Sequence, residues 1–233
     1  MAGHQVTALD MAASGIDTRS IQDVPTMAEY SQPLLDFMEE LPPDEKVVLV
    51  GHSLGGLNIA LAMEKFPDKI SVAVFLTAFM PDTVNPRSYV IREFFARALP
   101  GEWMGMVLTT QGGTTEPPAI MHFGAEFMKQ KFYQNSPTAD LELASLLTRP
   151  GSCYMQDLSK GEKFTEESYG SVERVYVVCG EDLGMPKEFQ YWMIENYGAT
   201  TDVMFIPSAD HSAMTSTPEE VVKCLLEAAG KYA

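Results

Sequence analysis

The sequence contains few cysteines and lacks any long apolar run. Its three cysteines, Cys153, Cys179 and Cys224, lie far apart without C-x-x-C spacing, which indicates free thiols in a reducing cytoplasm and argues against a zinc site. No uninterrupted apolar stretch approaches the roughly 20 residues that cross a bilayer. Residues 1–11 lack the basic and apolar pattern of a secretory signal. We therefore expect a cytoplasmic protein without a membrane partner.

Positive charge is also scarce. Sixteen Lys and Arg residues stand against 32 Asp and Glu residues, so the formal net charge is −16. This balance argues against nucleic acid or an anionic membrane as a partner. With 45% hydrophobic and 21% charged residues, the composition is otherwise that of an ordinary globule. The length of 233 residues suits one sizeable α/β domain.

The most informative stretch is residues 46–63, KVVLVGHSLGGLNIALAM. It opens with four apolar residues that suit a strand buried on both faces, and it continues as a helix-forming segment. The turn between them matches G-x-S-x-G, which in this context predicts a nucleophile elbow with Ser53 as the nucleophile. Gly51 and Gly55 would leave room for the strained turn, and Gly56 would let the helix approach closely. A chance match in a glycine- and serine-containing loop is the alternative.

The rest of the chain alternates between apolar runs and helical periodicity. Thr26 and Glu29 have the spacing of a capping box at the start of a helix that Pro42 and Pro43 end. Strands are predicted at 6–9, 47–50, 70–79, 175–179 and 203–206, and helices at 27–41, 187–197 and 218–232, besides the elbow helix. This order favours right-handed parallel crossovers and a doubly wound sheet.

The alternation breaks between residues 82 and 170. Helical pieces are predicted at 90–98 and 125–134, and no buried strand is expected. The many Met, Phe and Tyr residues suit a mobile apolar cap over a pocket. We interpret 82–170 as a cap inserted into one domain, whose core is formed by 1–81 and 171–233. An ordinary helical excursion packed on the sheet edge is the alternative.

A serine nucleophile needs a base in contact with it and a group that orients the base. The expected order along this kind of fold is Ser, then an acid, then His. His211 follows the last predicted strand, where a loop can face the elbow, and is therefore the expected base. The other histidines are less suited to this role. His4 lies before the first predicted strand, His52 lies inside the elbow with its side chain expected to point away from the serine, and His122 lies in the cap.

The acid is expected after the strand at 175–179. Asp182 is our choice, and its neighbour Glu181 is the local competitor. Asp210 is adjacent to the histidine in sequence and so is badly placed to brace it. Asp10 also ends a predicted strand, but it precedes the serine and breaks the expected order.

Four stretches together resemble the plant methylesterase family: VGHSLGGLNIALAMEKFPDKISVAVFLTAFMPD, LLTRPGS, YGSVERVYVVCGEDLGMPKEFQ and ADHSAM. The resemblance covers essentially the whole chain. It implies an α/β-hydrolase fold and a serine carboxylesterase that needs no cofactor. The expected substrate is a small apolar methyl ester of the plant hormone or alkaloid type, and the implied triad falls on Ser53, His211 and Asp182. Trp103 occupies the place of a cap tryptophan that lines the pocket in an esterase of that family.

Members of the family that act as hydroxynitrile lyases carry a lysine directly after the histidine. This chain has Ser212 there, at the floor of the expected pocket. Without that cation nothing obvious would stabilise a departing cyanide, so the lyase activity is disfavoured.

The family normally begins with a strand and a glycine-containing loop that would precede residue 1 of this chain. That strand lies centrally in the sheet, so the resemblance implies that the first core strand is missing. The loop supplies one of two oxyanion N–H donors, which would leave the amide of Leu54 as the other. The alternative functions are a slow or inactive hydrolase that binds a small ligand, and an esterase that decarboxylates an alkaloid aldehyde. An unpaired strand edge would favour a homodimer.

Overall fold

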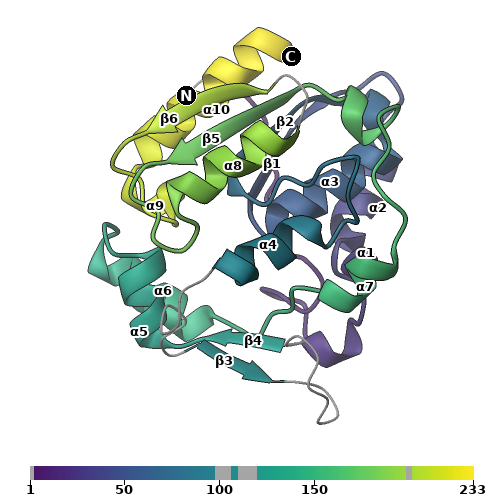
Figure 1. Ribbon diagram of the computed structural model, residues 1–233. Coiled ribbons are helices and arrows are strands. Elements are labelled where there is room, and N and C mark those ends of the chain that lie inside the picture. Colours follow the sequence, from purple (N-terminus) through teal and green to yellow (C-terminus); the bar gives the residue numbers. More distant parts are fainter. Residues whose placement is uncertain (1–2, 98–105, 110–119, 198–200) are drawn as a thin grey trace.

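A parallel sheet forms the centre of the molecule. The computed structural model describes residues 3–97, 106–109, 120–197 and 201–233. Within these ranges the sheet has four strands in the order β1-β2-β5-β6. The strands are β1 (Val47–Ser53), β2 (Ile70–Ala78), β5 (Arg174–Cys179) and β6 (Asp202–Ile206). Helices α3 (Gly55–Lys65) and α8 (Lys187–Tyr197) cover one face, and α10 (Pro218–Tyr232) covers the other (Figure 1). The predicted alternation of parallel strands and helices is confirmed.

The alternating side chains of β2 explain why helices are needed on both faces. Val72, Val74 and Leu76 pack in a cluster with residues of α10, whereas Ala73 and Phe75 pack in the larger cluster that includes α3. All five side chains are buried. Since successive strand residues point to opposite faces, a continuous apolar run requires cover on both sides.

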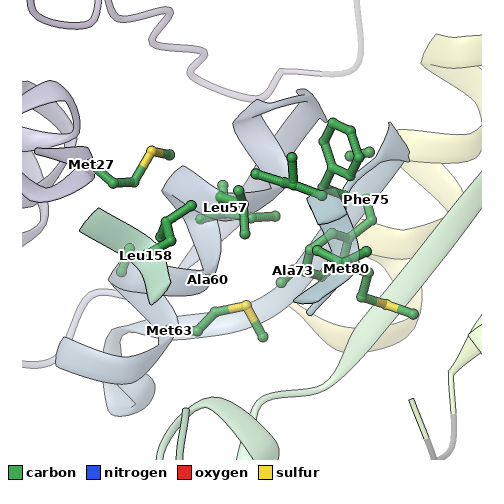
Figure 2. Close-up of a cluster of buried hydrophobic side chains, with 14 of the residues drawn as sticks. Met27, Leu57, Ala60, Met63, Ala73, Phe75, Met80 and Leu158 are labelled. Carbon is green, nitrogen blue, oxygen red and sulfur yellow. The ribbon is translucent and has the colours of Figure 1, made fainter. Parts of the chain in front are cut away.

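The larger cluster joins parts of the chain that are far apart in the sequence. Leu57, Ala60 and Met63 of α3 lie between the strands and the short helices beside them (Figure 2). Leu158 of α7 (Met155–Lys160) and Met27 of α1 (Met27–Tyr30) belong to the same cluster. The segment 82–170 therefore shares its buried surface with the rest of the protein.

The predicted helix at 27–41 begins as expected. Thr26 and Glu29 form the capping box with both hydrogen bonds present. The chain turns at Ser31. The single predicted helix is therefore two helices in the structure, α1 and α2 (Gln32–Glu40). The Ser31 hydroxyl donates to the carbonyl of Met27 at 2.7 Å, a local bond that competes with helix continuation.

Two expectations for the first 50 residues are wrong. Residues 6–9 form no strand in the described chain, and the side chain of Val6 is 85% exposed. A segment of only four residues, two of them β-branched, does not form a strand without a neighbour to pair with. β1 is an edge strand among the described residues, so Val50 is 41% exposed and not buried on both faces as predicted.

The segment 82–170 contains strands that the sequence analysis did not predict. β3 (Met106–Thr109) and β4 (Ile120–Phe123) form an antiparallel pair. Helices are present at both predicted places: α4 (Tyr89–Arg97), and α5 (Ala125–Phe127) with the π-helix η4 (Met128–Phe132). A further helix, α6 (Thr138–Leu147), was not predicted. The strand pair, α5 and α6 lie together at one end of the molecule, apart from the four-stranded sheet (Figure 1).

The remaining short elements connect these layers: η1 (Ile21–Asp23), η2 (Pro67–Lys69), η5 (Tyr169–Ser171) and α9 (Ala213–Ser216). Over the part of the chain that the structure describes, we find no helix with the length and apolar character required to span a membrane.

Candidate active site

Ser53 occupies a strained turn between β1 and α3. Its φ is +54°, a left-handed conformation that is uncommon for a residue with a side chain. A Cβ on Gly51 would lie 2.6 Å from the carbonyl oxygen of Gly55, and a Cβ on Gly56 would lie 2.1 Å from that of Phe79. Both glycines are therefore required. A Cβ on Gly55 would meet nothing within 4 Å, so the expected need for a small residue there is wrong.

The sheet brings three distant polar side chains into one hydrogen-bonded series. Nε2 of His211 lies 3.0 Å from Oγ of Ser53. Nδ1 of the same imidazole lies 2.7 Å from Oδ2 of Asp182. His211 is 4% exposed and Asp182 is 3% exposed. An imidazole held in this way can accept a proton from the serine while the carboxylate keeps its other nitrogen protonated.

Every side of the Asp182 carboxylate is occupied. Besides His211, Oδ2 accepts a hydrogen bond from the Thr77 hydroxyl at 2.5 Å. Oδ1 accepts from the amides of Gly184 at 2.7 Å and Met185 at 2.6 Å. An ionised carboxylate only accepts hydrogen bonds, so these donors fix its orientation.

The competing acids bind elsewhere. Oε2 of Glu181 accepts a hydrogen bond from the side-chain amide of Asn135 at 2.5 Å. Oδ2 of Asp210 accepts from the amide of Asn135 at 3.0 Å and from the hydroxyl of Ser136 at 2.9 Å. Asp10 accepts from the amide of Ile16 in an exposed loop. Glu181 and Asp210 thus fasten the segment after η4 to the loops that carry Asp182 and His211.

His52 also contacts His211, an interaction that the sequence analysis did not anticipate. Its Nε2 lies 2.7 Å from the carbonyl oxygen of His211, so this nitrogen carries a proton and donates it. Burial, and to a smaller extent the neighbouring His211, lower the pKa of His52 to about 4. His52 is therefore neutral at pH 7.

An aromatic side chain from the segment 82–170 covers His211. The ring of Phe132, in η4, stacks on the imidazole of His211 at a centroid distance of 4.3 Å and an angle of 25°. The carbonyl of Phe132 accepts a hydrogen bond from the amide of Ser212 at 3.0 Å. A Cβ on Gly184 would lie 2.5 Å from the Phe132 ring. Glycine at 184 therefore makes room for this stacking.

The other predicted site residues are placed as follows. Leu54 directly follows Ser53, and its amide stands at the N-cap position of α3. Ser212 is 3% exposed and lies against the main chain of Phe132. Trp103 lies outside the described residues. Position in the sequence is the signal that could have indicated these two contacts to His211. His52 is the direct neighbour of Ser53, and Phe132 lies in an aromatic-rich helical segment.

Comparison with known proteins gives a consistent result. The sequence profile described as "Alpha/beta hydrolase family" matches residues 1–223. Salicylic acid-binding protein 2 of Nicotiana tabacum is 51% identical over 231 residues, which cover 99% of this chain and 88% of that protein. Methylesterase 1 of Arabidopsis thaliana is 52% identical over 231 residues, with 99% and 87% covered.

A solved structure is also similar throughout. The crystal structure of polyneuridine aldehyde esterase, an enzyme known from Rauvolfia serpentina, matches with a TM-score of 0.91 at 47% identity. The match covers 97% of this chain and 88% of that chain.

Proposed function

Because the chain belongs to the alpha/beta hydrolase family and, within it, to the plant methylesterases, we propose that it is a serine carboxylesterase that hydrolyses small methyl esters. The observation that carries this proposal is the hydrogen-bonded series of a hydroxyl, an imidazole and a carboxylate. Its two distances, 3.0 and 2.7 Å, are those of a base in contact with a nucleophile and an acid in contact with the base.

In the first half of the reaction, the Ser53 oxygen attacks the ester carbonyl carbon while His211 Nε2 takes the hydroxyl proton. The Asp182 carboxylate stabilises the imidazolium that forms. The amide of Leu54 donates to the oxyanion of the tetrahedral intermediate. As that intermediate collapses, the bond from carbon to the methoxy oxygen breaks, and methanol leaves with the proton from His211.

In the second half, a water molecule replaces methanol. His211 takes a proton from the water as its oxygen attacks the acyl carbon. The second tetrahedral intermediate collapses, the bond to the Ser53 oxygen breaks, and the proton returns to that oxygen. The products are the free acid, methanol and the original enzyme.

The surroundings of the site support an apolar acyl group. Phe79 lies beside the elbow in space, since its amide donates to the carbonyl of Ser53 at 3.0 Å. Its ring packs edge-on against Phe94 at 5.3 Å. Phe123 packs at 4.9 Å against Phe132, the ring that stacks on His211. Aromatic side chains near a reactive site favour flat or aliphatic acyl parts over charged ones.

The segment 82–170 is proposed as the cap of this site, with Trp103 and Ser212 as substrate-binding residues. The stacking of Phe132, which belongs to this segment, on His211 supports that role. The free thiols of Cys153, Cys179 and Cys224 support a reducing compartment such as the cytoplasm. Association into a homodimer stays a prediction.

The test is turnover by the serine variant. We expect Ser53→Ala to lower kcat/KM for methyl salicylate, methyl jasmonate and p-nitrophenyl acetate by at least about 1,000-fold, because the variant lacks the hydroxyl that forms the acyl-enzyme. Mass spectrometry of the protein quenched during p-nitrophenyl acetate turnover should show one acetyl group on Ser53. Equal turnover by the variant and the parent protein would refute the proposal.

A second candidate function is ligand binding without useful turnover. One relative carries the name Salicylic acid-binding protein 2, which motivates this alternative. Titration calorimetry with salicylate, next to the turnover assay, separates the two functions. Binding of salicylate by a parent protein that hydrolyses none of the three esters would favour the binding function.

A further inference from the structure

Thr77 combines three unusual features at the end of β2. Its φ is +36°, a conformation that is an outlier for a β-branched residue. Its side chain is fully buried. Its hydroxyl lies 2.5 Å from Oδ2 of Asp182, the same oxygen that contacts His211. Strain of this kind persists only where the surrounding structure imposes it, and it concentrates at functional sites.

The strain comes from an irregularity in the pairing of β1 with β2. His52 pairs with Leu76, whereas Ser53 pairs with Ala78, so Thr77 is an extra residue in β2. An extra residue of this kind bends the strand and gives its side chain a new direction. The regular alternation of β2 would place residue 77 on the face of Ala73 and Phe75. The bulge instead directs it to the carboxylate.

The residues around the bulge hold it in place. Beyond the bulge, the carbonyl of Ala78 accepts a hydrogen bond from the hydroxyl of Tyr176 at 2.9 Å. The amide of Phe79 donates to the carbonyl of Ser53 at 3.0 Å. The chain on the C-terminal side of Thr77 is thus fixed both to β5 and to the nucleophile turn. A displacement of Thr77 would have to break these contacts.

We propose that Thr77 is a positioning residue of the esterase, whose hydroxyl orients the Asp182 carboxylate toward His211. The inference rests on the proposed function. Because an ionised carboxylate only accepts, the Thr77 hydroxyl donates its proton to Oδ2. The main-chain amides of Gly184 and Met185 fix Oδ1, and the Thr77 hydroxyl fixes Oδ2. Without it, the carboxylate can rotate about the remaining contacts and lose its alignment with Nδ1.

The test compares three substitutions at one position. Thr77→Val keeps the size and the branching of the side chain but removes the hydroxyl donor. Thr77→Ala removes the branching and the donor, and Thr77→Ser keeps the donor. We expect kcat for p-nitrophenyl acetate to fall about 10- to 100-fold in the Val and Ala variants, the range of a hydrogen bond to a charged group. KM should change less than about twofold, since Thr77 does not touch the substrate. The Ser variant should keep kcat within about threefold of the parent protein.

A spectroscopic measurement separates this proposal from the proposed function. The proton between Nδ1 of His211 and Asp182 should give a far-downfield proton NMR signal in the parent protein and in Thr77→Ser. We expect it to shift or broaden in Thr77→Val, whether or not the protein turns over ester. Thr217→Val is the matched control, because that buried hydroxyl donates to the carbonyl of Ala213 at 3.2 Å. It should leave both the signal and kcat unchanged.

The outcomes are decisive in both directions. If Thr77→Val keeps the parent kcat and the parent NMR signal, the proposal is wrong. It is also wrong if Thr77→Ser loses as much activity as Thr77→Val, because the hydroxyl would then not be the active feature. If Thr77→Val does not fold, Thr77→Ala provides the same comparison with Thr77→Ser. If the parent protein itself hydrolysed no ester, the proposed esterase function would be refuted. The NMR test of the Thr77 hydroxyl would still apply.

Discussion

The parallel-sheet core and the segment 82–170 contribute to the site in different ways. The core supplies the nucleophile turn, the imidazole and the carboxylate, each at the carboxyl end of a strand or in the loop after it. The segment supplies Phe132, which stacks on the imidazole, and the main-chain contacts that hold it there. We infer that the core determines the chemistry and the segment determines the environment in which it occurs.

The largest expected effect tests the contribution of the core. Asp182→Asn should lower kcat for p-nitrophenyl acetate on the order of 10,000-fold, because an amide favours the wrong imidazole tautomer and cannot stabilise the imidazolium. Asp210→Asn is the matched control, since Asp210 is equally buried and adjacent to His211 but binds Asn135 and Ser136. It should lower stability in urea and change kcat less than about tenfold. Comparable losses of kcat in both variants would contradict the division between core and segment.

A second experiment tests the contribution of the segment. Phe132→Leu removes the ring that stacks on His211 and keeps an apolar side chain. Since an aromatic face stabilises a nearby cation, we expect kcat to fall about 3- to 30-fold. Phe127→Leu is the matched control, because Phe127 belongs to the same ring cluster at 5.1 Å from Phe132. It should change kcat less than about twofold. Equal effects of both variants would mean that the segment acts only through packing.

The sequence predicted the core far better than the segment, and the reason is physical. The elbow has a local signature, because a strand, a glycine-flanked serine and a helix follow one another within 18 residues. Asp182 and His211 were found because each follows a buried strand, and parallel topology brings such ends together. These predictions need only the apolar pattern and the order of the elements.

The features that the sequence did not predict depend on pairing. The strand expected at 6–9 lacks a partner among the described residues, and a short apolar pattern does not reveal whether a partner exists. The antiparallel pair β3 and β4 consists of strands of four residues each, too short for a clear alternation. The bulge at Thr77 arises from the register of two strands. No property of a single residue indicates it.

The smallest expected effect concerns how the core holds its base. The folded-state pKa of His52 is about 4, below the value near 6.5 of an unfolded histidine. Between these values the unfolded chain binds a proton that the folded chain does not, so stability falls as the pH decreases from about 6.5 toward 4. His52→Gln keeps an amide donor for the carbonyl of His211 but does not titrate. Urea unfolding at pH 7 and pH 5 should therefore show a loss on acidification that is smaller in the variant by on the order of 1 to 2 kcal/mol. An equal loss in both proteins would mean that the folded protein does not keep this histidine neutral.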